Sequence, residues 1–270
     1  MRTKTFLLRT LSIALALSAS SSAVAHKLWL LPSYTILSEK EWVTVDAAVS
    51  NELFLFNHNP ARLDGLVVTS PSGKTATAAN QITARYRSSF DVELNEPGTW
   101  RIALAMHGMF ASWEEDGQPK RWRGTAEAFA KEVPANADKL TVQQMSTRVE
   151  TYVTAGAPSD SVFKTTGQGL EFAPVTHPND LFVGESAQFK LLLDGQPATG
   201  LKVTAIPGGV RYRNAQDAIE VTTDARGQFS IAWPAPGMYW LNASVQDDKA
   251  RKPATGRRAS WSATFEVLPQ

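Results

Sequence analysis

The sequence contains no cysteine, which limits how the chain can be stabilised. A domain without disulfides or thiolate metal sites must rest on its hydrophobic core. The supply of apolar side chains is sufficient, because hydrophobic residues make up 43% of the 270 residues and include 8 Trp and 12 Phe. The absence of cysteine also excludes every catalytic mechanism that uses a cysteine nucleophile.

Common catalytic motifs are absent as well. The chain has no Gly-x-Ser-x-Gly elbow, no His-Glu-x-x-His pair and no glycine-rich loop that would hold a phosphate. We therefore predict that the protein is not an enzyme. The one catalytic alternative that the residues leave open is a copper-dependent oxidase centred on His26.

Neither a large excess of one charge nor a long hydrophobic run is present. The 27 basic and 26 acidic residues nearly balance, which argues against a nucleic-acid partner. The apolar run from Leu11 to Leu17 is shorter than the about 20 residues that a membrane helix needs. Basic residues precede this run and an Ala-x-Ala tripeptide (Ala23 to Ala25) follows it, so residues 1–25 are typical of a cleavable signal peptide. We expect a periplasmic protein that is not inserted in the membrane after cleavage.

The remaining sequence consists of short apolar or alternating runs separated by Gly, Pro, Asn and Asp. This pattern predicts an all-β protein with two immunoglobulin-like or transthyretin-like β-sandwich domains, at residues 26–160 and 161–270. One short helix is expected before Pro134, with Thr125 as its N-cap. The strands expected in the first domain include 42–50, 64–74, 88–94 and 98–108.

The C-terminal half resembles the transthyretin-like or carboxypeptidase-regulatory sandwich. The resemblance rests on "DGQPATGLKVTAIPGG" and "TTDARGQFSIAWPAPGMYWLNAS". In these segments Asp194-Gly195 and Arg226-Gly227 are expected to form tight turns, because glycine accepts the positive φ that such turns require. A sandwich fold supports many functions, so this resemblance predicts the fold alone.

The position of His26 suggests a metal site. Cleavage after Ala25 would make His26 the first residue, with a free α-amine and an imidazole that can chelate one ion through the amine nitrogen and Nδ1. A second histidine could complete a set of three nitrogen ligands, which suits Cu, Ni, Co and Zn. The alternative is that cleavage falls a residue or two away and His26 is an ordinary polar residue at the start of a strand.

The other three histidines are weaker candidates for the same site. His58, His107 and His177 all fall near the predicted ends of strands or in turns, where loops can bring distant residues together. The sequence does not show whether any two of them approach each other. A separate candidate surface is the hairpin around Trp113 and Trp122, whose aromatic side chains could contact a partner.

Over nearly all of residues 26–268 the chain resembles the periplasmic domain-of-unknown-function family 4198. The resemblance rests on "AHKLWLLPS", "FNHNPARLDGLVV", "KRWRG", "LEFAPVTHPNDLFVGE" and "LLDGQPATGLKVTAIPGG". It implies a periplasmic component of cobalt or nickel uptake, or a protein that accompanies a TonB-dependent receptor in an iron or copper setting. His26 matches the opening motif of the family, and His58 and His177 match further motifs more weakly.

These observations predict a periplasmic protein that binds a transition-metal ion or a small metal complex for uptake or delivery. The predicted ligands are His26, His58, His107 and His177, and the predicted ion is Ni, Co, Cu or Fe. The alternative is a non-enzymatic interaction module that docks onto a transporter or a TonB-dependent receptor without a metal site of its own. In that case the Trp113 and Trp122 hairpin would be the contact surface.

Overall fold

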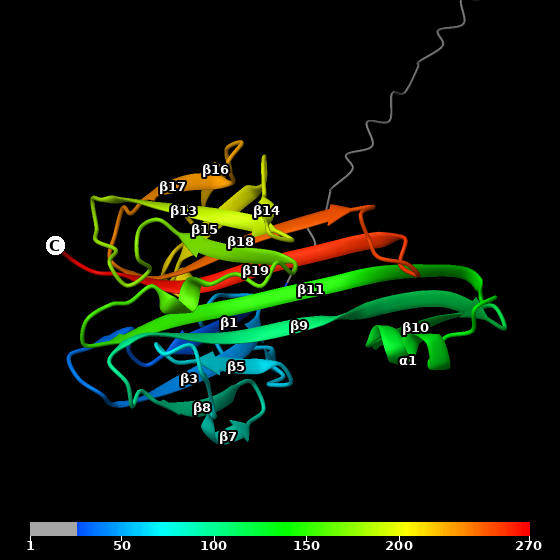
Figure 1. Ribbon diagram of the computed structural model, residues 1–270, viewed down its shortest axis with the longest axis horizontal. Coiled ribbons are helices and arrows are strands. Elements are labelled where there is room, and N and C mark those ends of the chain that lie inside the picture. Colours follow the sequence, from blue (N-terminus) through cyan, green and yellow to red (C-terminus); the bar gives the residue numbers. More distant parts are fainter. Residues whose placement is uncertain (1–25) are drawn as a thin grey trace, which may run out of the picture.

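The computed structural model describes residues 26–270, and the predicted signal peptide lies outside them. Strands dominate these residues, so the predicted all-β class is confirmed (Figure 1). Within the described range, no helix is long and apolar enough to cross a membrane. Three sheets account for the strands.

The first sheet has five antiparallel strands in the order β1-β3-β8-β7, with β4 paired to β3. Its strands are β1 (Lys27–Pro32), β3 (Trp42–Ser50), β4 (Asn59–Pro60), β7 (Ala79–Thr83) and β8 (Ser88–Glu93). The pattern "WVTVDAAVS" alternates and forms β3 at the predicted residues. Val43, Val45 and Ala47 face one core because alternate side chains of a strand point to the same face, and Ala48 faces the other side.

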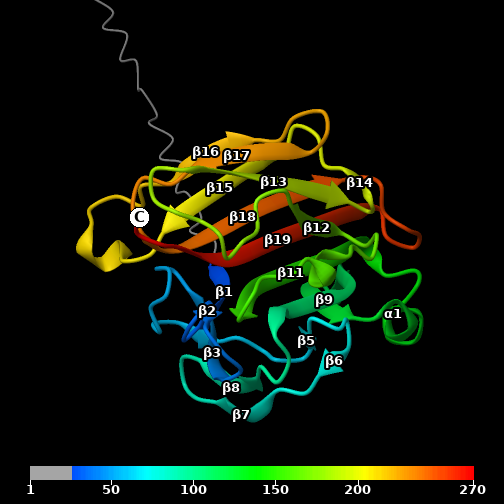
Figure 2. The same cartoon turned by 60° about the vertical axis from the view of Figure 1, so that its left-hand side comes forward.

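The second sheet has ten strands in the order β16-β15-β18-β19-β11-β9-β5-β6, with β10 paired to β9 and β2 paired to β11. From the first half of the chain come β2 (Ile36–Leu37), β5 (Leu66–Thr69), β6 (Thr75–Ala76), β9 (Gly98–Glu115), β10 (Gln118–Gly124) and β11 (Asp138–Ala155). From the second half come β15 (Lys202–Pro207), β16 (Ile219–Thr222), β18 (Gly237–Asp247) and β19 (Gly256–Val267). The parallel pairing of β11 with β19 therefore makes one sheet continuous across both halves (Figures 1 and 2).

The third sheet has four strands and lies on the opposite side of the large sheet from the first (Figure 2). It contains β12 (Leu170–Pro174), β13 (Ser186–Leu193), β14 (Gln196–Pro197) and β17 (Gln228–Ala232). The turn between β13 and β14 has Asp194 at φ 50° and Gly195 at φ 79°. This is the two-residue hairpin that the Asp-Gly pair predicts. The transthyretin-like resemblance itself stays a prediction.

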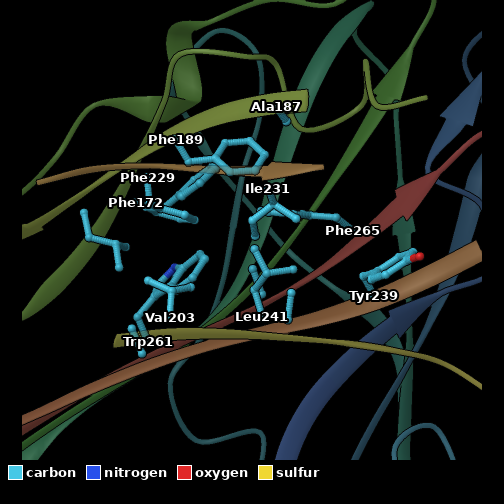
Figure 3. Packing of buried hydrophobic residues seen from close by; sticks show 14 of the residues in the cluster. Phe172, Ala187, Phe189, Val203, Phe229, Ile231, Tyr239, Leu241, Trp261 and Phe265 are labelled. Atoms are coloured by element: carbon cyan, nitrogen blue, oxygen red, sulfur yellow. The ribbon is translucent and has the colours of Figure 1, made fainter. Parts of the chain in front are cut away.

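Two separate cores fill the spaces between the sheets. The core between the first and second sheets is mainly aliphatic, with Val43, Val45 and Ile102 among its buried members. The core between the second and third sheets is rich in aromatic rings, and Phe172 stacks on Trp261 with ring centroids 5.2 Å apart (Figure 3). The predicted boundary at residue 160 falls between the two cores, and as a domain boundary it stays a prediction.

The segment between the strand predicted at 98–108 and the predicted boundary at residue 160 is more regular than a single helix. Residues 98–115 and 138–155 form two long strands, β9 and β11, which pair antiparallel over most of their length. Between them lies the predicted helix, α1 (Ala126–Glu132), with Thr125 Oγ1 accepting a hydrogen bond from the Ala128 N–H as the N-cap. Two short 3₁₀ helices, η1 (Ser161–Phe163) and η2 (Val210–Tyr212), lie in connections.

Candidate functional site

His26 and His58 lie together at one end of the first sheet. Their rings are stacked, with centroids 3.9 Å apart and planes inclined by 18°. The pairing of strands explains this meeting, since His26 directly precedes β1 and His58 directly precedes β4. Both strands pair with β3, where Lys27 lies opposite Ser50 and Asn59 lies opposite Val49. Residues separated by 32 positions in the sequence are thus brought together at the end of one strand.

The loop that carries His58 is held by aromatic packing on β1. Trp29 is fully buried, and its ring centroid lies 5.4 Å from those of both Phe54 and Phe56. The Trp29 indole N–H donates to Ser50 Oγ at 2.8 Å, and the Ser50 hydroxyl donates to the Glu52 carbonyl at 2.6 Å. Aromatic pairs of this kind contribute about 0.5–1.5 kcal/mol each beyond their buried area. The short segment preceding His58 is therefore fixed to the strand that follows His26.

The geometry of the pair is compatible with a shared metal ion. Metal–nitrogen bonds are about 2.0–2.1 Å long, so two nitrogens on one ion are separated by at most about 4.2 Å. The ring centroids are 3.9 Å apart, and sharing an ion requires a rotation that turns a nitrogen of each ring toward it. Neither ring makes a hydrogen bond to another described residue, so such a rotation breaks none of the hydrogen bonds within residues 26–270.

Within the described residues, His26 and His58 are not joined by a third side chain that could bind a metal ion. Within residues 26–270, no group of three or more His, Cys, Asp or Glu side chains is arranged to hold a metal ion. The additional nitrogen in the sequence-based prediction is the α-amine of His26, which exists only after cleavage between Ala25 and His26. Because Ala25 lies outside the described residues, this part of the site stays a prediction.

His177 lies in a different environment, between the first half of the chain and β12. The Asn179 backbone N–H donates to its Nδ1 at 3.1 Å, so the ring proton sits on Nε2 and is donated to Thr99 Oγ1 at 2.9 Å. Its ring also meets Phe163 edge to face at 5.4 Å. Burial lowers the pKa of His177, and the nearby Asp160 opposes this shift. Both ring nitrogens are therefore engaged in internal hydrogen bonds.

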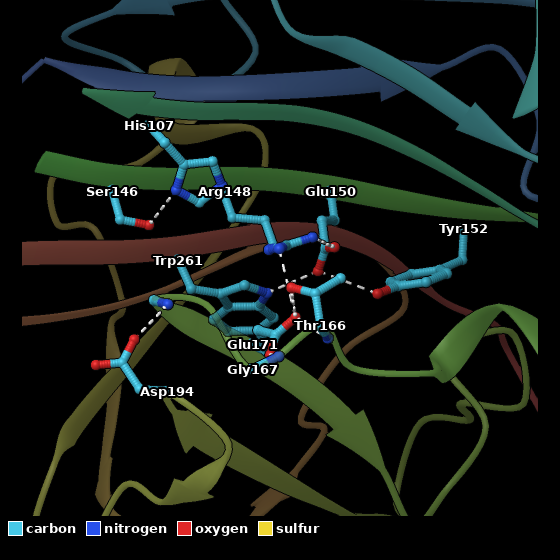
Figure 4. Close-up of polar contacts among 11 residues, drawn as sticks. His107, Ser146, Arg148, Glu150, Tyr152, Thr166, Gly167, Glu171, Asp194 and Trp261 are labelled. Carbon is cyan, nitrogen blue, oxygen red and sulfur yellow. Dashed lines mark hydrogen bonds and ion pairs between the residues drawn. The ribbon is translucent and has the colours of Figure 1, made fainter. Parts of the chain in front are cut away.

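His107 is also separate from the stacked pair. Its Nδ1 lies 3.2 Å from the Ser146 hydroxyl on the neighbouring strand β11 (Figure 4). Partial desolvation lowers the pKa of His107 first, and the positive charge of Arg148 lowers it further. The ring borders a cleft of about 330 Å³ whose lining includes Met109, Gln144 and Arg251.

Beside His107 lies a buried ionic network that the sequence analysis did not identify. Arg148 lies 3.5 Å from Glu150 and 3.4 Å from Glu171, and all three residues are nearly inaccessible to solvent (Figure 4). Glu171 also accepts hydrogen bonds from the backbone of residues 166 and 167. Burial, and then the charge of Glu150, raise the pKa of Tyr152 well above its ordinary value. Alternating charged residues in "STRVETYV" were the available signal, because every second residue of a strand shares one face.

The aromatic hairpin proposed as a contact surface is partly covered by the chain itself. Trp113 and Trp122 pack against a small core that includes Phe129 of helix α1. The Trp122 indole N–H donates to Glu132 at 2.7 Å, and its ring meets Phe129 edge to face. The helix therefore covers part of the hairpin surface that was predicted to contact a partner.

A model of a domain of unknown function, DUF4198, matches residues 23–247 of the chain. No curated protein matches the chain significantly. Among solved structures, the D0–D1 domain of intimin aligns at 12% identity over 87% of this chain and 96% of that chain, with a TM-score of 0.21. The adhesin InvE of Yersinia pseudotuberculosis aligns at 15% identity over 89% and 58%, with a TM-score of 0.22. The Escherichia coli alpha-2-macroglobulin aligns at 13% identity over 91% and 20%, with a TM-score of 0.23. Similarity at such low TM-scores does not indicate a shared activity.

Proposed function

Because the chain belongs to the DUF4198 family of unknown function, we propose its function from its own residues: it is a non-enzymatic periplasmic protein that binds a transition-metal ion through His26 and His58. The ion is a cargo for uptake or delivery. Its ligands are the α-amine and imidazole of His26, once the preceding 25 residues have been removed, and the imidazole of His58. The single observation that supports this proposal is the stacking of the two rings, 3.9 Å apart.

Strand pairing and aromatic packing hold His26 and His58 next to each other. They come from separate segments on either side of β3, and the packing of Phe54 and Phe56 on Trp29 holds the second segment in place. A chance contact between two flexible surface side chains would not require such an anchor. Preorganised ligands lower the conformational entropy that metal binding must overcome.

The chemistry of the ligands indicates which ions to test. Imidazole and amine nitrogens suit Cu, Ni, Co and Zn, and divalent ions bind such sites in the order Co, Ni, Cu with increasing affinity. We therefore expect Cu(II) to bind most tightly in solution. Binding must displace protons from the amine and imidazoles, so the affinity is expected to fall as the pH is lowered.

The test uses the protein after export, so that its own leader is removed. Mass spectrometry should give an N-terminus at His26, and calorimetric titration with Cu(II), Ni(II), Co(II), Zn(II) and Fe(II) should give a dissociation constant below about 1 μM for at least one of them. Adding a single alanine before His26 converts the amine to an amide and should weaken binding. The matched control is His107→Ala, which removes an exposed histidine elsewhere and should leave binding unchanged.

Two results would overturn the proposal. One is the absence of sub-micromolar binding by any of the ions in the protein with His26 at its N-terminus. The other is binding that is insensitive to both the alanine extension and His58→Ala. If metal binding is absent but a transporter or TonB-dependent receptor is captured, with capture lost in Trp113→Ala and Trp122→Ala variants, the protein is an interaction module instead.

A further inference from the structure

A second region of the molecule combines an open cavity with positively charged side chains. Two adjoining cavities, of about 330 Å³ and about 140 Å³, share His107, Gln144 and Arg251 in their linings. They lie where strands β9 and β11 meet the connection between β18 and β19, beside the start of helix α1. Small-molecule sites usually occupy clefts of about 300–1,000 Å³, so the larger cavity reaches that range.

The connection between β18 and β19 is docked onto the long strands, which fixes the position of its charges. Ala254 is buried in the small core that also contains Phe129 of helix α1. The backbone N–H of Thr255 donates to the Val142 carbonyl at 2.9 Å, and the backbone N–H of Arg251 donates to Gln144 Oε1 at 2.9 Å. The cationic residues of this connection are therefore attached to a defined wall of the cleft.

The cleft carries an excess of positive charge. Arg251 and Lys252 line the larger cavity, and Lys249 lines the smaller one. Within residues 26–270, none of these three side chains forms an ion pair. The one acid among the described residues of the two cavity linings, Asp194, pairs with Arg257, and Arg257 also pairs with Asp247. The described residues that line the two cavities therefore carry an excess of positive charge, with Lys249, Arg251, Lys252 and Arg257 against Asp194 alone.

The uncharged polar groups of the cleft lie beside an apolar wall. The Gln144 side-chain oxygen already accepts from Arg251, which leaves its amide N–H groups as donors. The Nδ1 of His107 is paired with Ser146, which leaves Nε2 for the cleft. Met109, Met145 and Ala126 supply apolar surface next to these groups. Cations and amide donors suit an anion, and the methionine side chains suit hydrocarbon.

We propose that this cleft binds a small organic carboxylate, with the carboxylate on Arg251 and Lys252 and the carbon chain against Met109 and Met145. A guanidinium group binds a carboxylate with two parallel hydrogen bonds, which adds geometric specificity to the charge attraction. The site is independent of the His26–His58 pair and uses none of its residues. It adds a second ligand class to the metal ion proposed above.

The experiment titrates the mature protein with three probes of related size or charge. Adipate carries two carboxylates and a hydrocarbon chain, dimethyl adipate carries the chain without charge, and inorganic phosphate carries charge without the chain. Adipate should bind with a dissociation constant below about 1 mM, and the other two should bind at least about tenfold more weakly. Comparable binding of phosphate, or no binding of adipate, would overturn the proposal.

Two variants test the assigned residues. Arg251→Gln should weaken adipate binding at least about tenfold, whereas the matched control Arg258→Gln, outside the cavity lining on the same hairpin, should not change it. Ala126→Asp places a carboxylate at the mouth of the cleft, in the first helical turn where an acid is favourable to folding, and should also weaken binding. His58→Ala should leave adipate binding unchanged, which separates failure of this site from failure of the metal site. Undiminished binding in both cleft variants would overturn the assignment.

Discussion

The four histidines fall into two kinds of environment. His26 and His58 meet ring to ring at the end of β3 and make no hydrogen bond to another described residue. His107 and His177 lie apart from them, each with a hydroxyl partner on a neighbouring segment. No hydrogen bond to another described residue engages the nitrogens of the pair, whereas His177 already uses both ring nitrogens in the fold.

This difference shows that a histidine near a strand end is not by itself a ligand. What distinguishes the pair is the packing behind it, because Trp29 holds the segment that leads to His58. What distinguishes His177 is the hydroxyl of Thr99, which is itself hydrogen-bonded to Thr154 within the sheet. The first arrangement leaves nitrogens available, and the second uses them to connect two halves of the chain.

The largest expected effect comes from removing the anchor of the pair. Trp29→Ala should lower the free energy of unfolding by about 3–5 kcal/mol, because it removes a fully buried aromatic side chain. The same change should release the loop before His58 and weaken metal binding. Urea denaturation checks the stability, and Trp42→Ala, at a tryptophan 48% exposed, is the control with an expected change of about 0.5 kcal/mol or less. Equal losses in the two variants would contradict the role assigned to Trp29.

Removing one member of the pair should separate binding from folding. His58→Ala should weaken metal binding by about 100-fold, or about 2.7 kcal/mol, since even changes around a metal ligand cost 10–100-fold. The free energy of unfolding without metal should change by about 0.5 kcal/mol or less, because the ring makes no hydrogen bond to other described residues. Calorimetric titration and urea denaturation of the same preparation give both values. A loss of stability as large as the loss of binding would show that the histidine is structural.

Sequence patterns predicted the local elements well. The alternating residues of β3, the helix after Thr125 and the turn at Asp194 were all predicted from short-range physical rules, and they form as expected. These features depend on neighbours within a few residues. Periodicity, capping and glycine conformation are therefore sufficient to identify them.

Contacts between residues that are far apart in the sequence could not be predicted from such short-range rules. The parallel pairing of β11 with β19 joins residues more than 100 positions apart, and nothing in either strand specifies its partner. The pattern of "STRVETYVTAG" predicts only the later part of β11, and the earlier residues from Asp138 are in the strand because they pair with β9. The meeting of His26 with His58 likewise depends on which strands flank β3. Sequence reasoning could nominate both histidines but could not show that they are neighbours.

Substitution of His177 should lower stability and leave metal binding unchanged, which is the opposite of the result expected for His58. His177→Ala should lower the free energy of unfolding by about 1–3 kcal/mol, because the Asn179 N–H and the Thr99 hydroxyl each lose a partner. Its affinity for metal should equal that of the unmodified protein. Thermal or urea unfolding and the same titration measure the two effects. Loss of metal binding in this variant would return His177 to the ligand set.

The smallest expected effect is a pH dependence of stability to which His177 contributes. Because burial lowers the pKa of His177 in the folded state, the unfolded chain takes up this proton first as the pH falls below about 6.5. The free energy of unfolding should therefore decrease from that pH down to the lower folded pKa, while above about 6.5 the group contributes no pH dependence. His177→Gln keeps one acceptor and one donor and should reduce this slope, as measured by urea denaturation between neutral and mildly acidic pH. A slope in His177→Gln equal to that of the unmodified protein would contradict this assignment.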